Sequence, residues 1–129
     1  MALTLSILDE TTAGKRRSAG DFSFDTETLS LRELIRRRVQ QEVERFNQSN
    51  LQTFQGLIQP GETERILNGV RERPVLDWEQ QYARAIIAFQ GNGFLVFVDD
   101  RQIIDLDQKI ELTTGTQVSF VKLVPLVGG

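Results

Sequence analysis

Few residue types in this chain could perform chemistry of their own. Its 129 residues include no cysteine and no histidine, which excludes disulfides, thiolate nucleophiles, imidazole bases and the usual zinc ligands. A carboxylate pair or a magnesium site made of carboxylates is still possible, but 18 acidic residues bring some carboxylates together by chance on a solvated surface. We therefore expect no catalytic residue, no metal site and no bound cofactor.

The C-terminal residues are the stronger candidates for a functional site. They are Pro125, Leu126, Val127, Gly128 and Gly129. Glycine has no Cβ and allows another molecule to approach its backbone closely, so this end could enter a narrow channel. Pro125 favours an extended conformation at Val124, so residues 125–129 would leave the fold as a flexible tail, with Leu126 and Val127 as apolar anchors. The alternative is a frayed chain end without a function.

The composition indicates a single globular domain over residues 1–129. Hydrophobic residues make up 40% of the chain, which is enough for a continuous core. The net charge of −3 argues against a nucleic-acid partner. The longest apolar run, residues 94–98, is too short for a membrane helix, and the N-terminus has no apolar signal region. We expect a cytoplasmic protein that does not bind membranes.

The N-terminal part should form a β-hairpin and a helix. Alternating apolar residues predict strands at 2–8 and 21–26, and the small, polar and basic residues between them predict a long, mobile hairpin tip over 9–20. Ser30 and Glu33 have capping-box spacing, and apolar residues then recur at intervals of three and four. This helix should lie across the sheet.

The middle of the chain differs in composition. Residues 47–76 begin with polar residues, contain a turn signal at Pro60-Gly61 and include a short helical pattern at 62–70, so we interpret them as an insertion. Asp77 is then a candidate N-cap for a second amphipathic helix, which Gly91 could end in a left-handed C-terminal cap.

The C-terminal third should complete the sheet. Residues 94–98 and 102–106 predict two strands joined by a tight turn at Asp99-Asp100. Residues 117–124 are rich in Val, Phe and Leu, which predicts a central strand buried on both faces. A hairpin, a crossing helix, a second hairpin and a central last strand predict an α+β fold, with a mixed sheet in the β-grasp order.

Four segments of this third carry a resemblance to a known family. They are residues 93–99, 102–104, 115–120 and 124–129. In these segments the chain resembles the small sulfur-carrier subunit of molybdopterin synthase and the thiamine-pathway sulfur carrier, both relatives of ubiquitin. The chain has one proline, Pro125, where the family often has two, and Thr116 where an acidic residue is usual. The insertion has no counterpart in the family.

The resemblance implies that a ubiquitin-activating-type adenylating enzyme uses ATP to attach AMP to the terminal carboxylate of Gly129. In one alternative the chain is then a ubiquitin-like modifier, which passes to a conjugating enzyme or target in a prokaryotic pathway. In another it is a sulfur carrier whose Gly129 thiocarboxylate donates sulfide to a sulfur-accepting synthase in molybdopterin, thiamine or related biosynthesis. A third hypothesis is a non-covalent β-grasp interaction module. The insertion favours the modifier, because it offers surface for a dedicated partner.

Two basic clusters are further candidates for a binding site. Lys15-Arg16-Arg17 and Arg36-Arg37-Arg38 could contact phosphate or an acidic partner. Because the whole chain is acidic, we interpret the first cluster as a solvated hairpin tip and the second as a solvated helix face.

Aromatic and aliphatic side chains could also form binding surfaces. Trp78, Tyr82 and Phe89 are expected to pack the second helix onto the core. An exposed face of the sheet could carry an apolar docking patch. The candidates for this patch are Phe97, Ile103 and Phe120.

Overall fold

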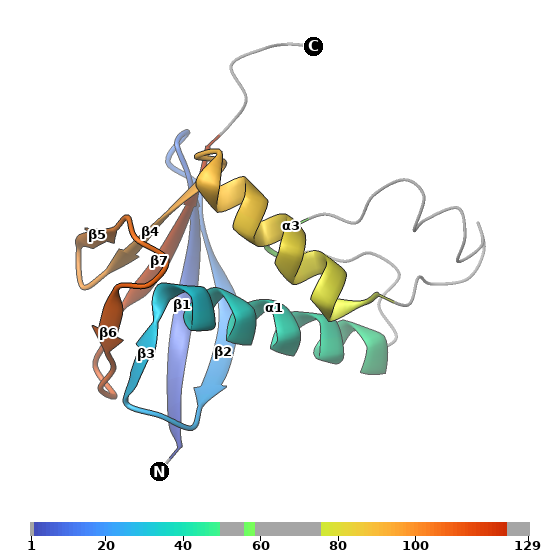
Figure 1. Ribbon diagram of the computed structural model, residues 1–129, viewed down its shortest axis with the longest axis horizontal. Coiled ribbons are helices and arrows are strands. Elements are labelled where there is room, and N and C mark those ends of the chain that lie inside the picture. The colour runs from blue at the N-terminus through green and yellow to red at the C-terminus, as the bar shows by residue number, and fades with distance from the viewer. Residues whose placement is uncertain (1, 50–55, 59–75, 124–129) are drawn as a thin grey trace.

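The computed structural model describes residues 2–49, 56–58 and 76–123, which form an α+β fold. The elements are β1 (Leu3–Thr11), β2 (Arg16–Phe24), β3 (Thr28–Ser30), α1 (Leu31–Gln48), α3 (Trp78–Gln90), β4 (Phe94–Val98), β5 (Arg101–Ile103), β6 (Lys109–Glu111) and β7 (Val118–Lys122). Five strands form one mixed sheet in the order β2-β1-β7-β4-β5, and β3 pairs with β6 in a second sheet. Both helices lie on the same face of the larger sheet (Figure 1).

The first hairpin is longer and more regular than its sequence predicts. β1 and β2 pair in antiparallel from Leu3 opposite Phe24 to Glu10 opposite Arg16. The predicted mobile tip over 9–20 is therefore wrong, because most of that stretch is paired strand. Its small, polar and basic residues are typical of loops, but they also suit strand positions that face solvent. Gly20, with a φ of 111°, lies where the pairing shifts register and a side chain would be strained.

Helix α1 begins where the sequence predicts. The Ser30 hydroxyl accepts a hydrogen bond of 3.2 Å from the Glu33 amide, which confirms the N-cap. The reciprocal half of the capping box is replaced, because the Glu33 carboxylate accepts from Arg36 at 3.1 Å. The apolar stripe of the helix packs into the core. It comprises Leu31, Leu34, Ile35, Val39, Val43 and Phe46.

The second helix, α3, has the predicted N-cap but a different end. Asp77 accepts a hydrogen bond of 3.0 Å from the Glu79 amide. Gly91 is the predicted left-handed residue, but its φ is −90°, and Asn92 takes that conformation instead with a φ of 61°. Asparagine tolerates this region better than most residues do. The helix therefore closes through hydrogen bonds that extend to Gly93, whose amide donates to the Ala88 carbonyl at 2.7 Å.

The last strand is central in the sheet, as predicted. β7 pairs in parallel with β1 and in antiparallel with β4. It is not buried on both faces, because its side chains alternate between buried and half-buried positions and no described element covers the second face. The turn at Asp99-Asp100 is confirmed, with φ values of 50° and 68°. The short strands β3 and β6 were not predicted.

The described parts of the insertion are anchored to the first helix. Asn47 holds the far end of residues 47–76, because its side chain donates to the Leu76 carbonyl at 2.9 Å and accepts from the Leu76 amide at 3.0 Å. Leu57 is buried in the core, and its amide donates to Glu42 at 3.1 Å. The helical pattern predicted at 62–70 lies outside the described residues.

Candidate functional site

The tail predicted from the sequence, Pro125 to Gly129, lies outside the described residues. The structure does describe the strand end to which it is attached. β7 ends at Lys122, and the amide of the next residue, Leu123, donates a hydrogen bond of 3.1 Å to the Gly93 carbonyl. The central strand therefore stays held by its neighbours up to the point where the described chain stops. We take this end of the sheet as the candidate functional site.

The predicted docking patch is wrong for two of its three residues. Ile103 and Phe120 have exposed fractions of 5% and 0% and belong to the core. Both pair with buried Val96 and so share its face, which packs into the core, whereas Phe97 is half-buried on the opposite face. The alternation of each strand indicates which residues share a face, but it does not say which face the helices cover.

The uncovered face carries a different apolar group around Phe97, the open-face patch, formed by Leu8, Leu95, Phe97 and Val121. Leu8 and Phe97 both pair with Ser119 of β7, from opposite sides of that strand. Leu95 lies opposite Val121 in the next row. Leu8 is 37% exposed, and the other three are half-buried. The patch thus extends across β1, β7 and β4 beside the end of the central strand.

A buried ion cluster lies on the helix side of the same sheet end. The Arg38 side chain is 0% exposed and binds Asp9 through two hydrogen bonds of 2.6 and 2.7 Å. It also donates to Glu42 at 3.1 Å, and its guanidinium carbon lies 4.5 Å from the centre of the Phe120 ring. Burial opposes the charge of Arg38, but Glu42 and Asp9 outweigh it and raise the pKa of this residue.

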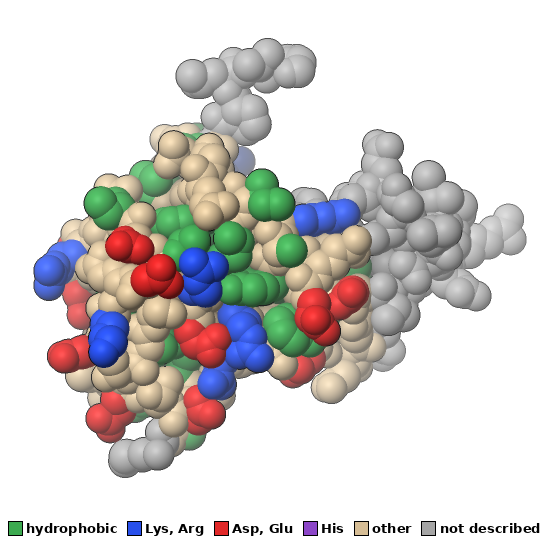
Figure 2. Space-filling view, viewed as in Figure 1, with side chains coloured by type: hydrophobic (Ala, Val, Ile, Leu, Met, Phe, Trp, Pro, Cys, Tyr) green, Lys and Arg blue, Asp and Glu red, His purple; other side chains and the backbone are tan. Residues whose placement is uncertain are grey.

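The interpretation of Arg36-Arg37-Arg38 as a solvated helix face is therefore wrong for Arg38, which is buried. It follows Leu34 by four residues and Ile35 by three, so it lies on the apolar stripe of α1. Arg36 and Arg37 are partly exposed. Charges of both signs are interspersed over the helix-bearing side of the molecule (Figure 2). The spacing along the helix is the signal that separates Arg38 from its neighbours.

Lys122 joins the end of β7 to this cluster. Its ammonium nitrogen lies 3.8 Å from a carboxylate oxygen of Asp9 and donates to the Gly56 carbonyl at 3.5 Å. Burial lowers the pKa of Lys122, with Arg38 and Arg17 acting in the same direction and Asp9 and Glu42 against it. Lys122 is thus a half-buried cation in a region that already holds other cations.

A cavity of about 560 Å³ opens beside Lys122, and we call it the strand-end cavity. Three parts of the chain that are far apart in the sequence supply its lining: the β1-β2 hairpin, Gly56 and Lys122. The hairpin contributes Asp9, Glu10, Thr11, Lys15, Arg16 and Arg17. The sequence singles out Lys15-Arg16-Arg17 but gives no reason to join it to Lys122, because that proximity depends on the parallel pairing of Thr11 with Lys122.

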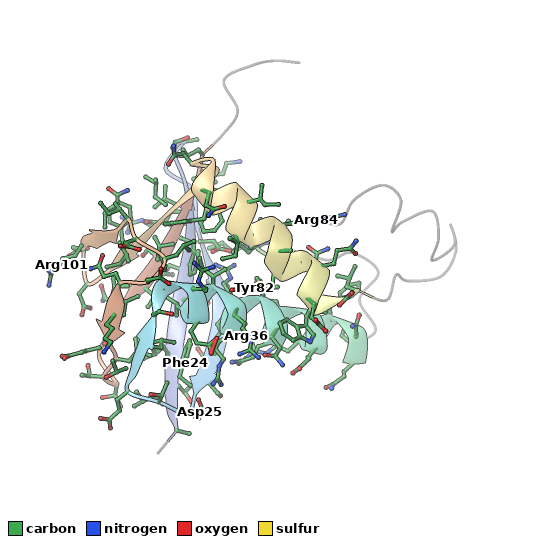
Figure 3. All side chains as sticks on the ribbon, in the orientation of Figure 1. Phe24, Asp25, Arg36, Tyr82, Arg84 and Arg101 are labelled. Atoms are coloured by element: carbon green, nitrogen blue, oxygen red, sulfur yellow. The ribbon has the colours of Figure 1, made fainter. Side chains whose placement is uncertain are left out.

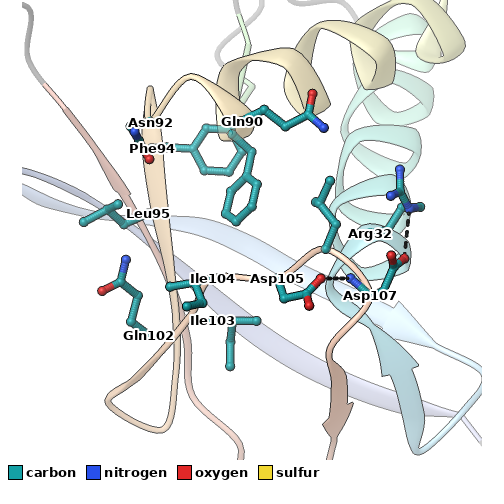
Figure 4. Close-up of a pocket in the computed structure, with 12 residues that line it drawn as sticks. Arg32, Gln90, Asn92, Phe94, Leu95, Gln102, Ile103, Ile104, Asp105 and Asp107 are labelled. Carbon is teal, nitrogen blue, oxygen red and sulfur yellow. Dashed lines mark hydrogen bonds and ion pairs between the residues drawn. The ribbon is translucent and has the colours of Figure 1, made fainter.

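A second cavity of about 600 Å³ lies between the end of α3, the β4-β5 hairpin and residues 104–107 (Figure 4). Its charged groups contact one another: Asp105 accepts from the Asp107 amide at 2.9 Å, and Arg32 pairs with the Asp107 carboxylate at 3.5 Å. Ile104 at its edge is 73% exposed. The lining presents no nucleophile with an adjacent base, so its arrangement does not favour catalysis.

The aromatic residues of α3 pack as predicted. Trp78, Tyr82 and Phe89 are partly buried against the core, and Tyr82 lies where α3 faces α1 (Figure 3). Arg36 of α1 lies over the Trp78 ring, 5.3 Å from its centre. These contacts join the two helices and leave little of the aromatic stripe for a partner.

Comparison of the chain with protein-family models, curated proteins and solved structures finds no match. The family expected from the C-terminal sequence therefore stays a prediction. Within residues 2–49, 56–58 and 76–123, no group of acidic side chains has the arrangement of a metal site. No helix among these residues is long and apolar enough to cross a membrane.

Proposed function

We propose that this chain is a ubiquitin-like β-grasp protein whose Gly129 carboxylate is activated by adenylation in a partner enzyme. The observation that carries the proposal is the position of β7, central in the sheet, parallel to β1 and followed by the tail. The strand order and the crossing of one face by α1 are those expected of a β-grasp fold. A central strand gives the tail a rigid base, so a partner that binds the sheet can guide Gly129 into its nucleotide site.

The proposed chemistry takes place on this protein and is performed by its partners. The Gly129 carboxylate attacks the α-phosphorus of ATP, an acyl–AMP bond forms and pyrophosphate leaves. A thiolate of the activating or conjugating enzyme then attacks the acyl carbon and AMP leaves. Because this chain has no cysteine, that thiolate has to come from the partner. An amine of the target finally displaces the thiolate, and an amide links Gly129 to the target.

The open-face patch is the proposed contact with the activating enzyme. Leu8, Leu95, Phe97 and Val121 lie on the face that no described element covers, and the patch extends to the end of β7. An enzyme that covers these side chains would bury apolar area and hold the base of the tail at the same time. Phe97 is the one residue of the sequence-predicted docking patch that belongs to this surface.

The test combines the protein with ATP, magnesium and an adenylating enzyme of the ubiquitin-activating type from the same genome. ATP–pyrophosphate exchange should depend on the protein. When a conjugating enzyme and a target amine are added, intact mass spectrometry should show a conjugate that has lost one water. Gly129→Trp should abolish the exchange, whereas Gly115→Ala, at an exposed glycine with open space around it, should leave it unchanged. Exchange that survives in Gly129→Trp would refute the proposal.

Mass spectrometry also separates the related hypotheses. Replacement of one carboxylate oxygen of Gly129 by sulfur, with a sulfide donor present, would identify a sulfur carrier that shares the adenylation step. The absence of exchange and of any adduct would favour the non-covalent module. Phe97→Ser tests the patch, because it should raise the KM for the protein in the exchange reaction and leave kcat unchanged. Gln80→Ser, at an exposed site of α3 on the other side of the sheet, is the control.

A further inference from the structure

The strand-end cavity has an excess of positive charge in a chain that is acidic overall. Among the described residues, four cationic side chains and two carboxylates line it, while the net charge of the whole chain is −3. Arg38 and Glu42, which lie behind the lining, add one charge of each sign and leave this excess of two unchanged. The cavity is therefore a local positive region, of the kind that attracts anions.

Both carboxylates of the lining are already bound by arginines. Asp9 accepts two hydrogen bonds from Arg38, at 2.6 and 2.7 Å, and Glu10 pairs with Arg16 at 2.6 Å. Each carboxylate therefore has an arginine as its nearest cation, and Asp9 reaches Lys122 only through a longer ion pair. Among the described residues no carboxylate lies within salt-bridge distance of the Lys15 ammonium, and the nearest contact of Lys122 with a carboxylate is 3.8 Å.

Lys122 is held where a ligand could complete its contacts. Its ammonium group can donate three hydrogen bonds. Its hydrogen bond to the Gly56 carbonyl is long, at 3.5 Å. The pKa of this residue is lowered by burial and by the neighbouring Arg38 and Arg17, which means that the charged form lacks sufficient compensation. A bound anion would supply that compensation.

We propose that the strand-end cavity binds the phosphate group of a small phosphorylated molecule. Lys122 and Lys15 donate to the phosphate oxygens, and the Thr11 hydroxyl is placed to donate a third hydrogen bond from the same wall. A phosphate carries about two negative charges at neutral pH, which matches the charge excess of the lining better than a single carboxylate does. The site is independent of the proposed activation of Gly129, because none of these residues belongs to the tail or to the open-face patch.

Nuclear magnetic resonance titration of the full chain with inorganic phosphate and with pyrophosphate, at constant ionic strength, tests the site. Saturable shifts are expected at the amides of Thr11, Gly56 and Lys122. Lys122→Gln should weaken binding about tenfold or more, which is the loss expected for one charge-assisted hydrogen bond. Lys15→Gln, in the exposed hairpin turn, should also weaken binding. Because this position is exposed, the loss in this variant cannot come from a folding defect of the kind that Lys122→Gln could cause.

Lys109→Gln is the matched control, because it removes the same charge from an exposed position in β6 outside the cavity. An equal loss in Lys109→Gln and Lys122→Gln would overturn the proposal, as would shifts that do not saturate. Titrations with AMP and ATP distinguish the sources of the phosphate. Tighter binding of either nucleotide than of pyrophosphate would assign the site to a nucleotide, and equal or weaker binding would assign it to a free phosphate ion.

Discussion

Removal of Arg38 should destabilise the protein more than any surface substitution. Arg38→Met keeps most of the apolar stem of the side chain but removes the guanidinium from Asp9 and Glu42, and leaves Lys122, 3.8 Å from Asp9, as a cation beside them. The side chains of Asp9 and Glu42 are only 7% and 9% exposed, so water cannot replace the guanidinium. Removal of one partner from a buried ion pair costs about 3–5 kcal/mol. That is a large part of the roughly 5–15 kcal/mol that stabilises a domain.

Urea unfolding followed by circular dichroism measures this loss as a lower midpoint at an unchanged slope. The matched control is Arg32→Met, because Arg32 is half exposed and pairs with Asp107 at 3.5 Å. Its loss should stay within about 1 kcal/mol. A loss for Arg38→Met as small as that of the control would refute the reasoning.

A compensating variant separates buried charge from lost packing. Asp9→Leu and Glu42→Gln, added to Arg38→Met, remove both carboxylates. The side-chain oxygen of the new glutamine can still accept the hydrogen bond from the Leu57 amide, which Glu42 accepts at 3.1 Å. Replacing a buried ion pair by neutral side chains is often close to neutral in stability, and Lys122, which loses Asp9 in this variant, is 32% exposed and keeps part of its hydration. The triple variant should therefore recover most of the loss. If it is less stable than Arg38→Met, packing of the guanidinium is the dominant effect.

Three further changes should alter the stability measurably. Burial, opposed by Asp9, lowers the pKa of Lys122 in the folded protein below the 10.5 of an unperturbed lysine. At a pH between the folded and the unfolded pKa, the unfolded chain binds more protons than the folded protein, so the stability of the wild type to urea should rise with pH. The Lys122→Met variant should lack this rise. Gly20→Ala should lower the free energy of unfolding by about 1–2 kcal/mol in thermal denaturation, because φ is 111° and the new Cβ would lie 3.2 Å from Arg45. The control Gly115→Ala, whose Cβ would meet no atom within 4 Å, should leave the free energy of unfolding unchanged. Asp100→Gly should stabilise by about 0.5–1 kcal/mol in the same assay, because Asp100 has a φ of 68°, whereas Asp99→Gly should gain less because it loses the bond of 2.9 Å to the Gln117 amide.

Local signals predicted the parts of the fold that depend on neighbours in the sequence. The Ser30 cap, the Asp77 cap and the Asp99-Asp100 turn each need only a few residues with the right side chains, and all three are confirmed. The central position of β7 was also predictable, because its apolar content is that of a strand with neighbours on both sides. Three-residue strands such as β3 are too short for a periodic pattern to identify them.

One error is local, because Asn92 and not Gly91 takes the left-handed conformation after α3. The other errors concern contacts between segments that are distant in the sequence. Whether Phe120 or Phe97 faces solvent depends on which face α1 covers, and alternation within a strand is the same for either choice. The sequence predicts a mobile tip over 9–20 because this stretch is rich in small, polar and basic residues, and nothing local indicates that Asp9 has a buried partner. That partner is Arg38, 29 residues away, and only the packing of α1 on β1 brings them together.

The described part of the insertion takes part in the fold. The Leu57 side chain is 6% exposed in the core, its amide binds Glu42, and the Gly56 carbonyl accepts from Lys122. Residues 56–58 therefore connect the ion cluster of Arg38 to the end of β7, where the tail begins. A substitution in residues 56–58 should therefore displace Lys122 and alter the strand-end cavity more than it affects Gly129. The open-face patch, on the other side of the sheet, would be affected least, so variants in 56–58 should separate binding of phosphate from binding of the activating enzyme.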